Sequence, residues 1–228
     1  MARLVRAPDP AAAAAALLTH RLEQVDAQRG CARLAVAGGS AMAALGQVRR
    51  GLAPGVWGRV RLTWVDERCC PFADPESNRG GAYRDGHLDP GNPPALELPL
   101  YLDGETPQGA GSRVASALAG PFQGGLDLLL LGMGEDGHIA SLFPGQPWRG
   151  GGGEPAFAVL ASPKPPPRRI TLALDFLAAA EGILLAAGEG KRSALERLLR
   201  RDPALPGSAL PDLTVVTDLE GVVPEVLP

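Results

Sequence analysis

The chain has 228 residues, of which 45% are hydrophobic, and a formal net charge of −3. This length and apolar content predict a domain with a large buried core and exclude a disordered chain. The acidic balance, without a basic stripe, excludes nucleic acid as an expected partner.

The N-terminal segment is rich in alanine and is predicted to form a helix. Asp9 stands in the position of an N-cap, and Pro10 would occupy the first helical position. A signal peptide is a poorer interpretation, because two prolines precede the alanines and no clear cleavage site follows them. No stretch reaches the ~18 strongly apolar residues that a membrane span needs, so no membrane partner is expected.

Short apolar runs of strand length recur along the rest of the chain and alternate with helix-like segments. Runs that are apolar throughout are typical of parallel strands that are covered on both faces. The expected strands are residues 33–38, 59–65, 126–132, 157–161, 169–174, 182–188 and 213–218.

The alternation predicts a single α/β domain over residues 1–228, with a mostly parallel sheet covered by helices on both faces. In such a sheet, ligands bind beyond the carboxyl ends of the strands. Unusual residues follow five of the strand segments, and we expect the five loops to converge on one rim. These loops begin after Gly38, Val65, Gly132, Ala161 and Gly188.

Two glycine turns lie between a strand and a helix. Gly38, Gly39 and Ser40 allow the backbone to approach an anion, and the helix N-terminus supplies free N–H groups. A tight turn with a serine cap explains this turn equally well. In the second turn, Lys191 opposes the helix dipole unless an anion binds there, and a solvated lysine is the alternative. Neither turn matches the P-loop or the G-x-G-x-x-G fingerprint.

Two further segments gather charged residues. Asp66 and Arg68 directly follow the strand at 59–65, where an arginine held by carboxylates can clamp an oxyanion. Charged residues at this place are also the ordinary solvated exit of a strand. Lys164 and Arg169 lie on a proline-rich segment whose stiffness lowers the entropy cost of holding charges in place. The alternative for this segment is a rigid surface connection.

A histidine at position 138 has the strongest catalytic context in the chain. It follows a glycine turn at a strand end, and Asp136 precedes it by two residues. A histidine near its reference pKa is a natural general base at neutral pH, and a carboxylate can orient its ring. A histidine that caps the next short helix is the structural alternative. A Ser-His-Asp hydrolase is disfavoured, because the chain has no G-x-S-x-G motif.

Neither a metal nor a cofactor is expected. His20 and His87 lie in segments unrelated to His138, and no H-x-x-x-H spacing occurs. The three cysteines are an odd number, with Cys69 and Cys70 adjacent, so they form neither a disulfide framework nor a zinc-ligand pattern. We expect a reducing, cytoplasmic location.

Taken together, four segments resemble the 6-phosphogluconolactonase family, in that family's order and over most of the chain. The resemblance implies kinship with glucosamine-6-phosphate deaminases and ribose-5-phosphate isomerases, and hence a modified Rossmann-like sheet. One departure is that the first glycine loop reads AGGSAM rather than SGGSTP, so Ala41 lacks a hydroxyl. The segments are 65–78 (VDERCCPFADPESN), 126–145 (LDLLLLGMGEDGHIASLFPG), 162–174 (SPKPPPRRITLAL) and 188–191 (GEGK).

The resemblance implies hydrolysis of 6-phospho-D-glucono-1,5-lactone to 6-phosphogluconate, the second step of the oxidative pentose phosphate pathway. His138 is expected to activate water, and Asp66 and Asp136 to orient His138 or the substrate hydroxyls. Which cation holds the phosphate stays open at this point, as does the oligomeric state. The residues expected to bind the sugar phosphate are Gly38, Gly39, Ser40, Arg68, Lys164, Arg169 and Lys191.

Two alternative functions remain. An amino-sugar-phosphate deaminase or isomerase would use the same fold, but the corresponding motif there resembles DEY, whereas this chain has Arg68 as its third residue. A non-catalytic sugar-phosphate-binding domain is the second alternative. A histidine retained in a catalytic loop, His138, argues against it.

Overall fold

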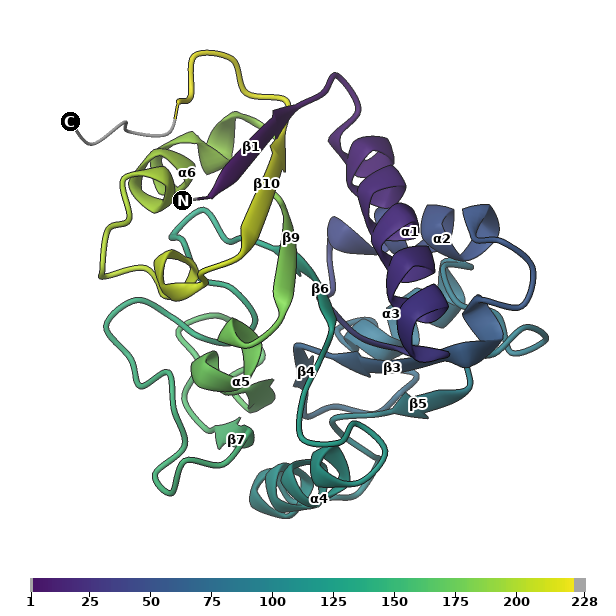
Figure 1. Cartoon of the computed structure of the whole chain (residues 1–228). Helices are drawn as coiled ribbons and strands as arrows, with labels where there is room; N and C mark the ends of the chain where they lie inside the picture. The colour runs from purple at the N-terminus through teal and green to yellow at the C-terminus, as the bar shows by residue number, and fades with distance from the viewer. Residues whose placement is uncertain (1, 224–228) are drawn as a thin grey trace.

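The computed structural model describes residues 2–223, and its largest element is a sheet of seven strands that pair in parallel (Figure 1). The order across the sheet is β1-β10-β9-β6-β2-β3-β5. The strands are β1 (Arg3–Arg6), β2 (Ala32–Val36), β3 (Val60–Trp64), β5 (Leu96–Leu98), β6 (Leu128–Gly132), β9 (Glu181–Leu185) and β10 (Leu213–Thr217).

Helices flank this sheet, as predicted for the fold class. The helices α1 and α2 lie together on one side of strands β6, β9 and β10, and α6 lies on the other (Figure 1). The strand β6 is central and is apolar throughout because it is covered on both faces: Leu129, Leu130 and Leu131 are fully buried. The helices are α1 (Pro10–Arg29), α2 (Ala41–Gly51), α3 (Asn78–Arg84), α4 (Pro107–Ala119), α5 (Leu174–Ala178) and α6 (Arg192–Leu199).

The N-terminal helix begins where the sequence predicts. The Asp9 side chain accepts a hydrogen bond from the backbone N–H of Ala12 at 3.0 Å, and Pro10 is the first helical residue. Gly30 ends the helix in the left-handed conformation, with φ at 73°. Among the described residues, no helix is long and apolar enough to cross a bilayer.

A second sheet of three antiparallel strands corrects part of the sequence analysis. Its order is β4-β8-β7, formed by β4 (Asp66–Arg68), β7 (Ala156–Val159) and β8 (Arg169–Leu172). The segments 157–161 and 169–174 are therefore not strands of the parallel sheet. Short apolar runs look alike in parallel and antiparallel sheets, so the pattern alone did not separate them.

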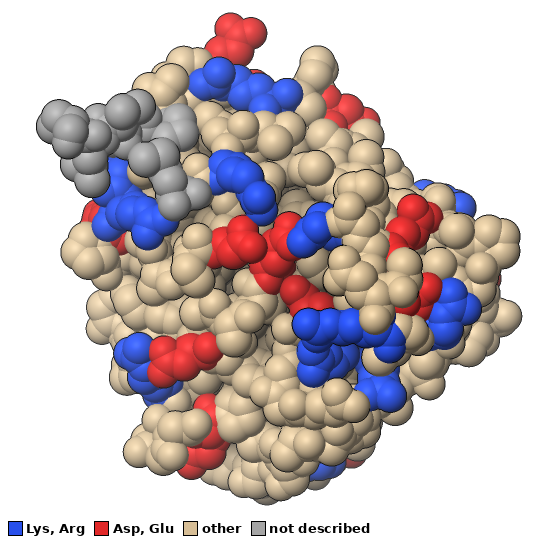
Figure 2. Space-filling view, in the orientation of Figure 1, with Lys and Arg blue, Asp and Glu red and all other residues tan. Residues whose placement is uncertain are grey.

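The same correction applies to the expected rim of five loops. Four of the loops follow β2, β3, β6 and β9, whose carboxyl ends lie at one edge of the parallel sheet. The loop after Ala161 instead connects β7 to β8 in the second sheet. Charged side chains of both signs are interspersed on the face shown in Figure 2, so no single-sign patch covers that face.

Candidate active site

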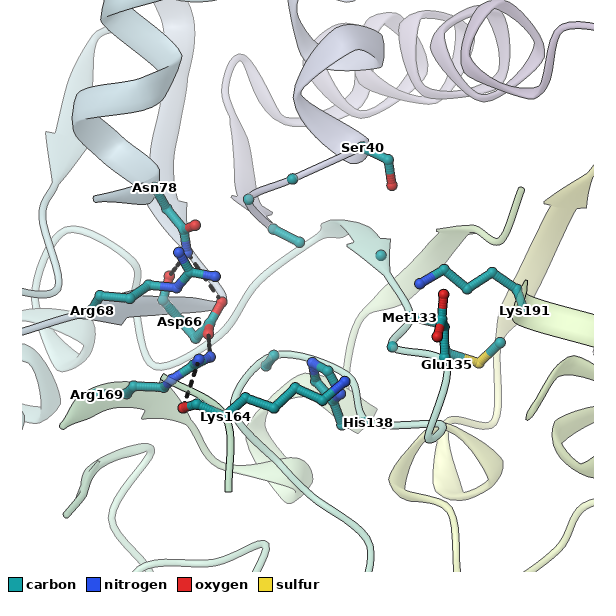
Figure 3. Close-up of a pocket in the computed structure, with 16 residues that line it drawn as sticks. Ser40, Asp66, Arg68, Asn78, Met133, Glu135, His138, Lys164, Arg169 and Lys191 are labelled. Carbon is teal, nitrogen blue, oxygen red and sulfur yellow. Dashed lines mark hydrogen bonds and ion pairs between the residues drawn. The ribbon is translucent and has the colours of Figure 1, made fainter. Parts of the chain in front are cut away.

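A cavity of about 360 Å³ lies at the carboxyl edge of the parallel sheet, beside the second sheet (Figure 3). This volume is within the usual range for a small-molecule site. Of the residues that the sequence predicts for the site, all except Asp136 line the cavity, and Asp136 contacts His138, which does line it. Residues from five loops thus meet in one place, although one of these loops belongs to the second sheet.

The His138 ring is held from two sides. Its Nδ1 lies 2.5 Å from Oδ1 of Asp136, and the ring stacks on Phe143 with centroids 4.5 Å apart. The His138 ring and the Asp136 carboxylate also pack closely against Gly134 in the turn that precedes them. A Cβ at Gly134 would lie 2.0 Å from Nδ1 of His138, so only glycine fits there. Gly137, with φ at 85°, completes the turn.

The environment of His138 keeps the ring neutral. Burial lowers the pKa of His138, and the hydrogen bond with Asp136 opposes this effect only in part. Burial raises the pKa of Asp136, but the bond to His138 and the charge of Lys164 outweigh it, so the pKa of Asp136 is lowered. An ionised Asp136 accepts a hydrogen bond from the N–H at Nδ1, which leaves Nε2 of His138 as the ring's acceptor nitrogen.

Asp66 lies in a buried polar network next to the cavity. Its Oδ2 accepts a hydrogen bond from Oγ of Ser141 at 2.6 Å, and it lies 3.7 Å from Nη1 of Arg169. The Asn78 side chain donates to the backbone oxygen of Asp66 at 3.0 Å. The Asp66 and Arg169 side chains are only 7% and 4% exposed, so this charge pair depends on its partners.

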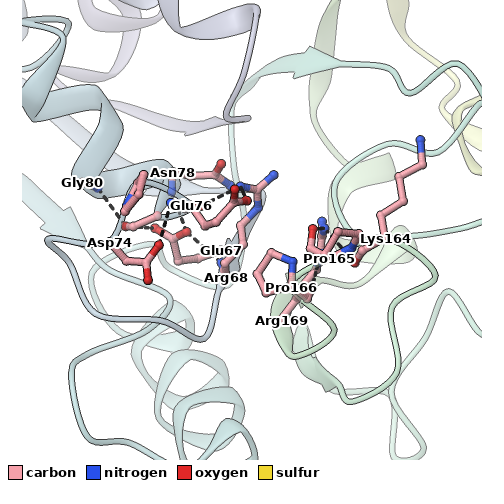
Figure 4. A network of polar contacts seen from close by, with 12 residues as sticks. Glu67, Arg68, Asp74, Glu76, Asn78, Gly80, Lys164, Pro165, Pro166 and Arg169 are labelled. Carbon is pink, nitrogen blue, oxygen red and sulfur yellow. Dashed lines mark hydrogen bonds and ion pairs between the residues drawn. The ribbon is translucent and has the colours of Figure 1, made fainter.

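Arg169 anchors the loop that carries Lys164. Its guanidinium donates to the backbone oxygens of Pro166 at 3.0 Å, Lys164 at 3.2 Å and Pro165 at 2.8 Å (Figure 4). It also donates to Oγ of Ser141 at 3.3 Å. Most of its N–H groups are therefore engaged within the protein. The phosphate contact predicted for Arg169 stays a prediction, and the structure favours a positioning role.

Glu67 holds the start of α3 and is the most thoroughly bonded carboxylate near the cavity (Figure 4). It accepts hydrogen bonds from the backbone N–H groups of Arg68, Asn78 and Arg79 at 2.7 to 2.8 Å, and from Oγ of Ser77 at 3.2 Å. Burial raises the pKa of Glu67, and these backbone bonds act against the rise. The segment 66–68 is thus an ordered strand with buried, hydrogen-bonded carboxylates, and not the solvent-exposed end of the preceding strand.

The first glycine turn leaves its polar groups facing the cavity. Ser40 is the N-cap residue of α2, but its side chain makes no capping hydrogen bond. Gly39 has φ at 66°, and a Cβ at Gly38 would lie 1.9 Å from Oδ1 of Asn78, so both positions require glycine. The Ser40 hydroxyl and the α2 N-terminus together form a place where an anion is favoured.

Two lysines define different parts of the cavity. Lys164 and Lys191 are the only lysines among the 22 basic residues of the chain, and both line it. Nζ of Lys164 lies 3.5 Å from Oδ1 of Asp136, next to His138. Lys191 lies on the side where Ser40 is seen, and Arg68, Asp66 and Asn78 form the opposite side (Figure 3).

Three lining or supporting residues were missed by the sequence analysis. Ser141 and Asn78 form hydrogen bonds with the buried carboxylate of Asp66. The only signal in the sequence that could have suggested them is that a buried carboxylate needs hydrogen-bond donors. Glu135 also lines the cavity. Its carboxylate packs against the turn before Lys191, since a Cβ at Gly190 would lie 2.6 Å from Oε1 of Glu135.

The adjacent cysteines have the character of inert thiols. Burial raises the pKa of Cys69 to about 12 and that of Cys70 to about 11, so both are protonated at neutral pH. Over residues 2–223, no group of three or more His, Cys, Asp and Glu side chains is arranged to hold a metal ion.

Comparisons with known proteins agree with the resemblance carried by the motifs. Residues 6–217 match the model of the glucosamine-6-phosphate isomerases/6-phosphogluconolactonase family. A rat 6-phosphogluconolactonase is 36% identical over 195 residues, which are 81% of this chain and 75% of the rat protein. A Streptomyces coelicolor 6-phosphogluconolactonase is 36% identical over 206 residues, which cover 83% and 78% of the two chains.

The fold is also similar to solved structures. A 6-phosphogluconolactonase from Thermotoga maritima superposes with a TM-score of 0.80 over 95% of this chain and 99% of that one, at 21% identity. At this identity the likeness concerns the fold alone.

Proposed function

Because the chain belongs to the glucosamine-6-phosphate isomerases/6-phosphogluconolactonase family, we propose that it hydrolyses 6-phospho-D-glucono-1,5-lactone to 6-phosphogluconate. The observation that carries the proposal is the His138–Asp136 pair, which presents a neutral imidazole to a cavity. The same cavity is lined by the glycine turn at Gly38–Ser40, which is suited to an anion, and by the side chain of Lys191. Water supplies the nucleophile for this reaction, which is the second step of the oxidative pentose phosphate pathway.

The proposed role of His138 follows from its tautomer. With Nδ1 committed to Asp136, Nε2 accepts a proton from the water that attacks C1 of the lactone. The same nitrogen then returns this proton to the ring oxygen as the C1–O5 bond breaks. Asp136 holds the ring in place and stabilises the imidazolium that forms between the two steps.

The phosphate is assigned to the side of the cavity formed by Ser40 and Lys191. The support is chemical: a serine hydroxyl without a capping bond, the positive end of the α2 dipole and an ammonium group all face a ligand there. Arg68, across the cavity, donates to the backbone oxygen of Glu76 at 2.6 Å. This bond fixes one end of the guanidinium, and because Arg68 lines the cavity, its remaining N–H groups are suited to contact the sugar hydroxyls. Asp66, locked by Ser141 and Arg169, is suited to the same contact.

A glucosamine-6-phosphate deaminase activity is the second candidate, because the family includes such enzymes and the fold does not separate the two. The curated relatives at 36% identity are lactonases, which favours lactone hydrolysis. A cytoplasmic location stays a prediction. Some relatives are chloroplastic, as in rice, and one human relative is named an endoplasmic bifunctional protein.

The direct test is a coupled assay. The lactone is generated freshly from glucose 6-phosphate, and formation of 6-phosphogluconate is followed above the spontaneous rate. We expect clear acceleration by the wild-type protein and no release of ammonia from glucosamine 6-phosphate. A lactone rate equal to the spontaneous one would overturn the proposal, and ammonia release would replace it with the deaminase.

A further inference from the structure

The placement of the two lysines of the chain points to a specific chemical role for each. The sequence has 22 basic residues, of which only Lys164 and Lys191 are lysines, and both line the cavity. All other basic residues of the chain are arginines. A lysine ammonium is a compact charge with three donors on a flexible stem, whereas a guanidinium is a planar fork with a fixed geometry. A flexible ammonium group can stay within hydrogen-bond distance of an oxygen atom whose position shifts during a reaction. The cavity is lined by two such groups.

Lys164 is placed at the reacting end of the cavity by a rigid loop. Its backbone oxygen accepts bonds from Nη2 of Arg169 at 3.2 Å and from Oγ of Ser162 at 2.8 Å. The loop is closed by a bond from the N–H of Ser162 to the oxygen of Pro167 at 2.9 Å. The backbone is therefore fixed, while the side chain extends over the cavity toward His138 (Figure 3).

The ammonium of Lys164 has free capacity for a ligand. Its side chain is 44% exposed, and Nζ lies 3.5 Å from Oδ1 of Asp136, a charge contact that is too long and too exposed to engage all three donors. Within residues 2–223, Nζ makes no hydrogen bond to the protein. The same carboxylate oxygen is the partner of His138, so the ammonium stands beside the base that activates water.

We propose that Lys164 is a further catalytic residue, whose ammonium binds the lactone carbonyl oxygen and stabilises the oxyanion that forms when water adds to C1. This inference rests on the proposed function and adds the electrophilic partner of His138. It gives the two lysines different roles, since Lys164 acts at C1 and Lys191 acts at the phosphate.

Atoms and charge are conserved in the proposed reaction. The water oxygen forms a bond to C1, its proton passes to Nε2 of His138, and the electron pair of the C1=O bond moves to the carbonyl oxygen next to Lys164. When this intermediate collapses, the C1–O5 bond breaks, and O5 takes the proton from His138. Lys164 keeps its own protons throughout, so it contributes by charge and hydrogen bonding alone.

Three variants test this division of roles: Lys164→Met, Lys164→Arg and, as the matched control, Lys191→Met. For Lys164→Met we expect kcat to fall by about 10²-fold to 10³-fold, the usual cost of one lost oxyanion donor, with little change in KM. Lys164→Arg should recover part of the rate because it keeps the charge. Lys191→Met should mainly raise KM and weaken competitive inhibition by inorganic phosphate.

A pH profile adds a readout that a purely structural role would not move. The charged groups that face His138 are Asp136 and Asp66, which raise its pKa, and Lys164, which lowers it. In Lys164→Met, the acid limb of kcat/KM should therefore move to higher pH. The limb should stay in place in Lys191→Met.

The inference is overturned if Lys164→Met keeps its kcat while KM and the phosphate inhibition constant rise, because Lys164 would then belong to the phosphate site. A wild-type protein without lactonase activity would overturn the proposed function first, so the two failures are distinguishable.

Should Lys164→Met fail to fold, the wild-type protein can be reductively methylated with ¹³C-formaldehyde and a borane reductant, which labels two side chains and the chain terminus. We expect one lysine signal to titrate with His138 and the other to shift with inorganic phosphate. A single lysine signal that follows both would contradict the division of roles.

Discussion

The two sides of the cavity differ in whether their charged and polar groups are buried and hydrogen-bonded or accessible. On one side, Asp66, Glu67 and Arg169 are buried, and their polar atoms are bonded within the protein. On the other, Ser40 and Lys191 are accessible, and within residues 2–223 their side chains make no hydrogen bond to the protein. A buried charge is tolerated only with partners, so it can hold a loop but has little left for a ligand. The bonded side therefore mainly positions the site and offers contacts to the sugar hydroxyls only, whereas the open side is suited to bind the phosphate.

The largest effect is expected at His138, which joins the two sides. His138→Ala should lower kcat by about 10²-fold to 10⁴-fold, because general acid–base catalysis is lost. Its matched control is His20→Ala on α1, which lies outside the cavity and should keep full activity. Steady-state kinetics on the fresh lactone measure both variants, and a His138→Ala enzyme within a few-fold of wild type would exclude the base assignment.

Substitutions on the bonded side should lower stability. Glu67→Ala leaves several buried N–H groups without an acceptor, and we expect the free energy of unfolding to drop by about 3 kcal/mol. Glu76→Ala, an exposed carboxylate of the same segment, should change it by less than about 0.5 kcal/mol. Urea denaturation gives both values. Equal losses in the two variants would show that the bonds to Glu67 contribute little.

Substitutions on the open side should lower affinity instead. In Lys191→Met we expect KM to rise about 10-fold to 10²-fold, the loss of a charged hydrogen bond to the phosphate, with unchanged unfolding. Arg192→Met is the neighbouring control, since Arg192 pairs with Glu189 outside the cavity. If the two variants had the same KM, the phosphate would have to be placed elsewhere.

The pH dependence of the rate probes the histidine between the two sides. Burial lowers the pKa of His138 from its ordinary value, so the neutral base persists below that value, and kcat/KM should fall only at more acidic pH. Asp136→Asn removes a group that raises this pKa, so the acid limb should move further down while kcat also drops. A limb that moves up in this variant would contradict the assigned partner of His138.

The smallest effect is expected far from both sides. Asp9→Ala removes the N-cap of α1 and should lower the free energy of unfolding by about 1 kcal/mol. Asp9→Asn retains a capping oxygen and should change it much less. Neither variant should alter kcat, and a loss of activity in either would mean that α1 influences the cavity.

Local chemistry made much of the fold predictable from the sequence. Asp9, Pro10 and Gly30 delimit α1 through caps that depend on a few neighbouring residues. The apolar runs of β2 and β6 and the glycine turns after them likewise depend on short segments. Only one residue separates Asp136 from His138, so their contact was also accessible to a local argument.

Tertiary structure decided which distant groups meet. Ser141 bonds Asp66 across 75 positions of sequence, and Arg169 reaches Ser141 across 28. No local pattern specifies such pairs, because they arise only when the second sheet docks beside the first. The amino-acid order alone determined which residues stand at the strand ends. The docking of the two sheets decided which of them are buried to hold the site and which, like Lys164, are left free to act in it, since burial forces a charge to find its partners within the protein.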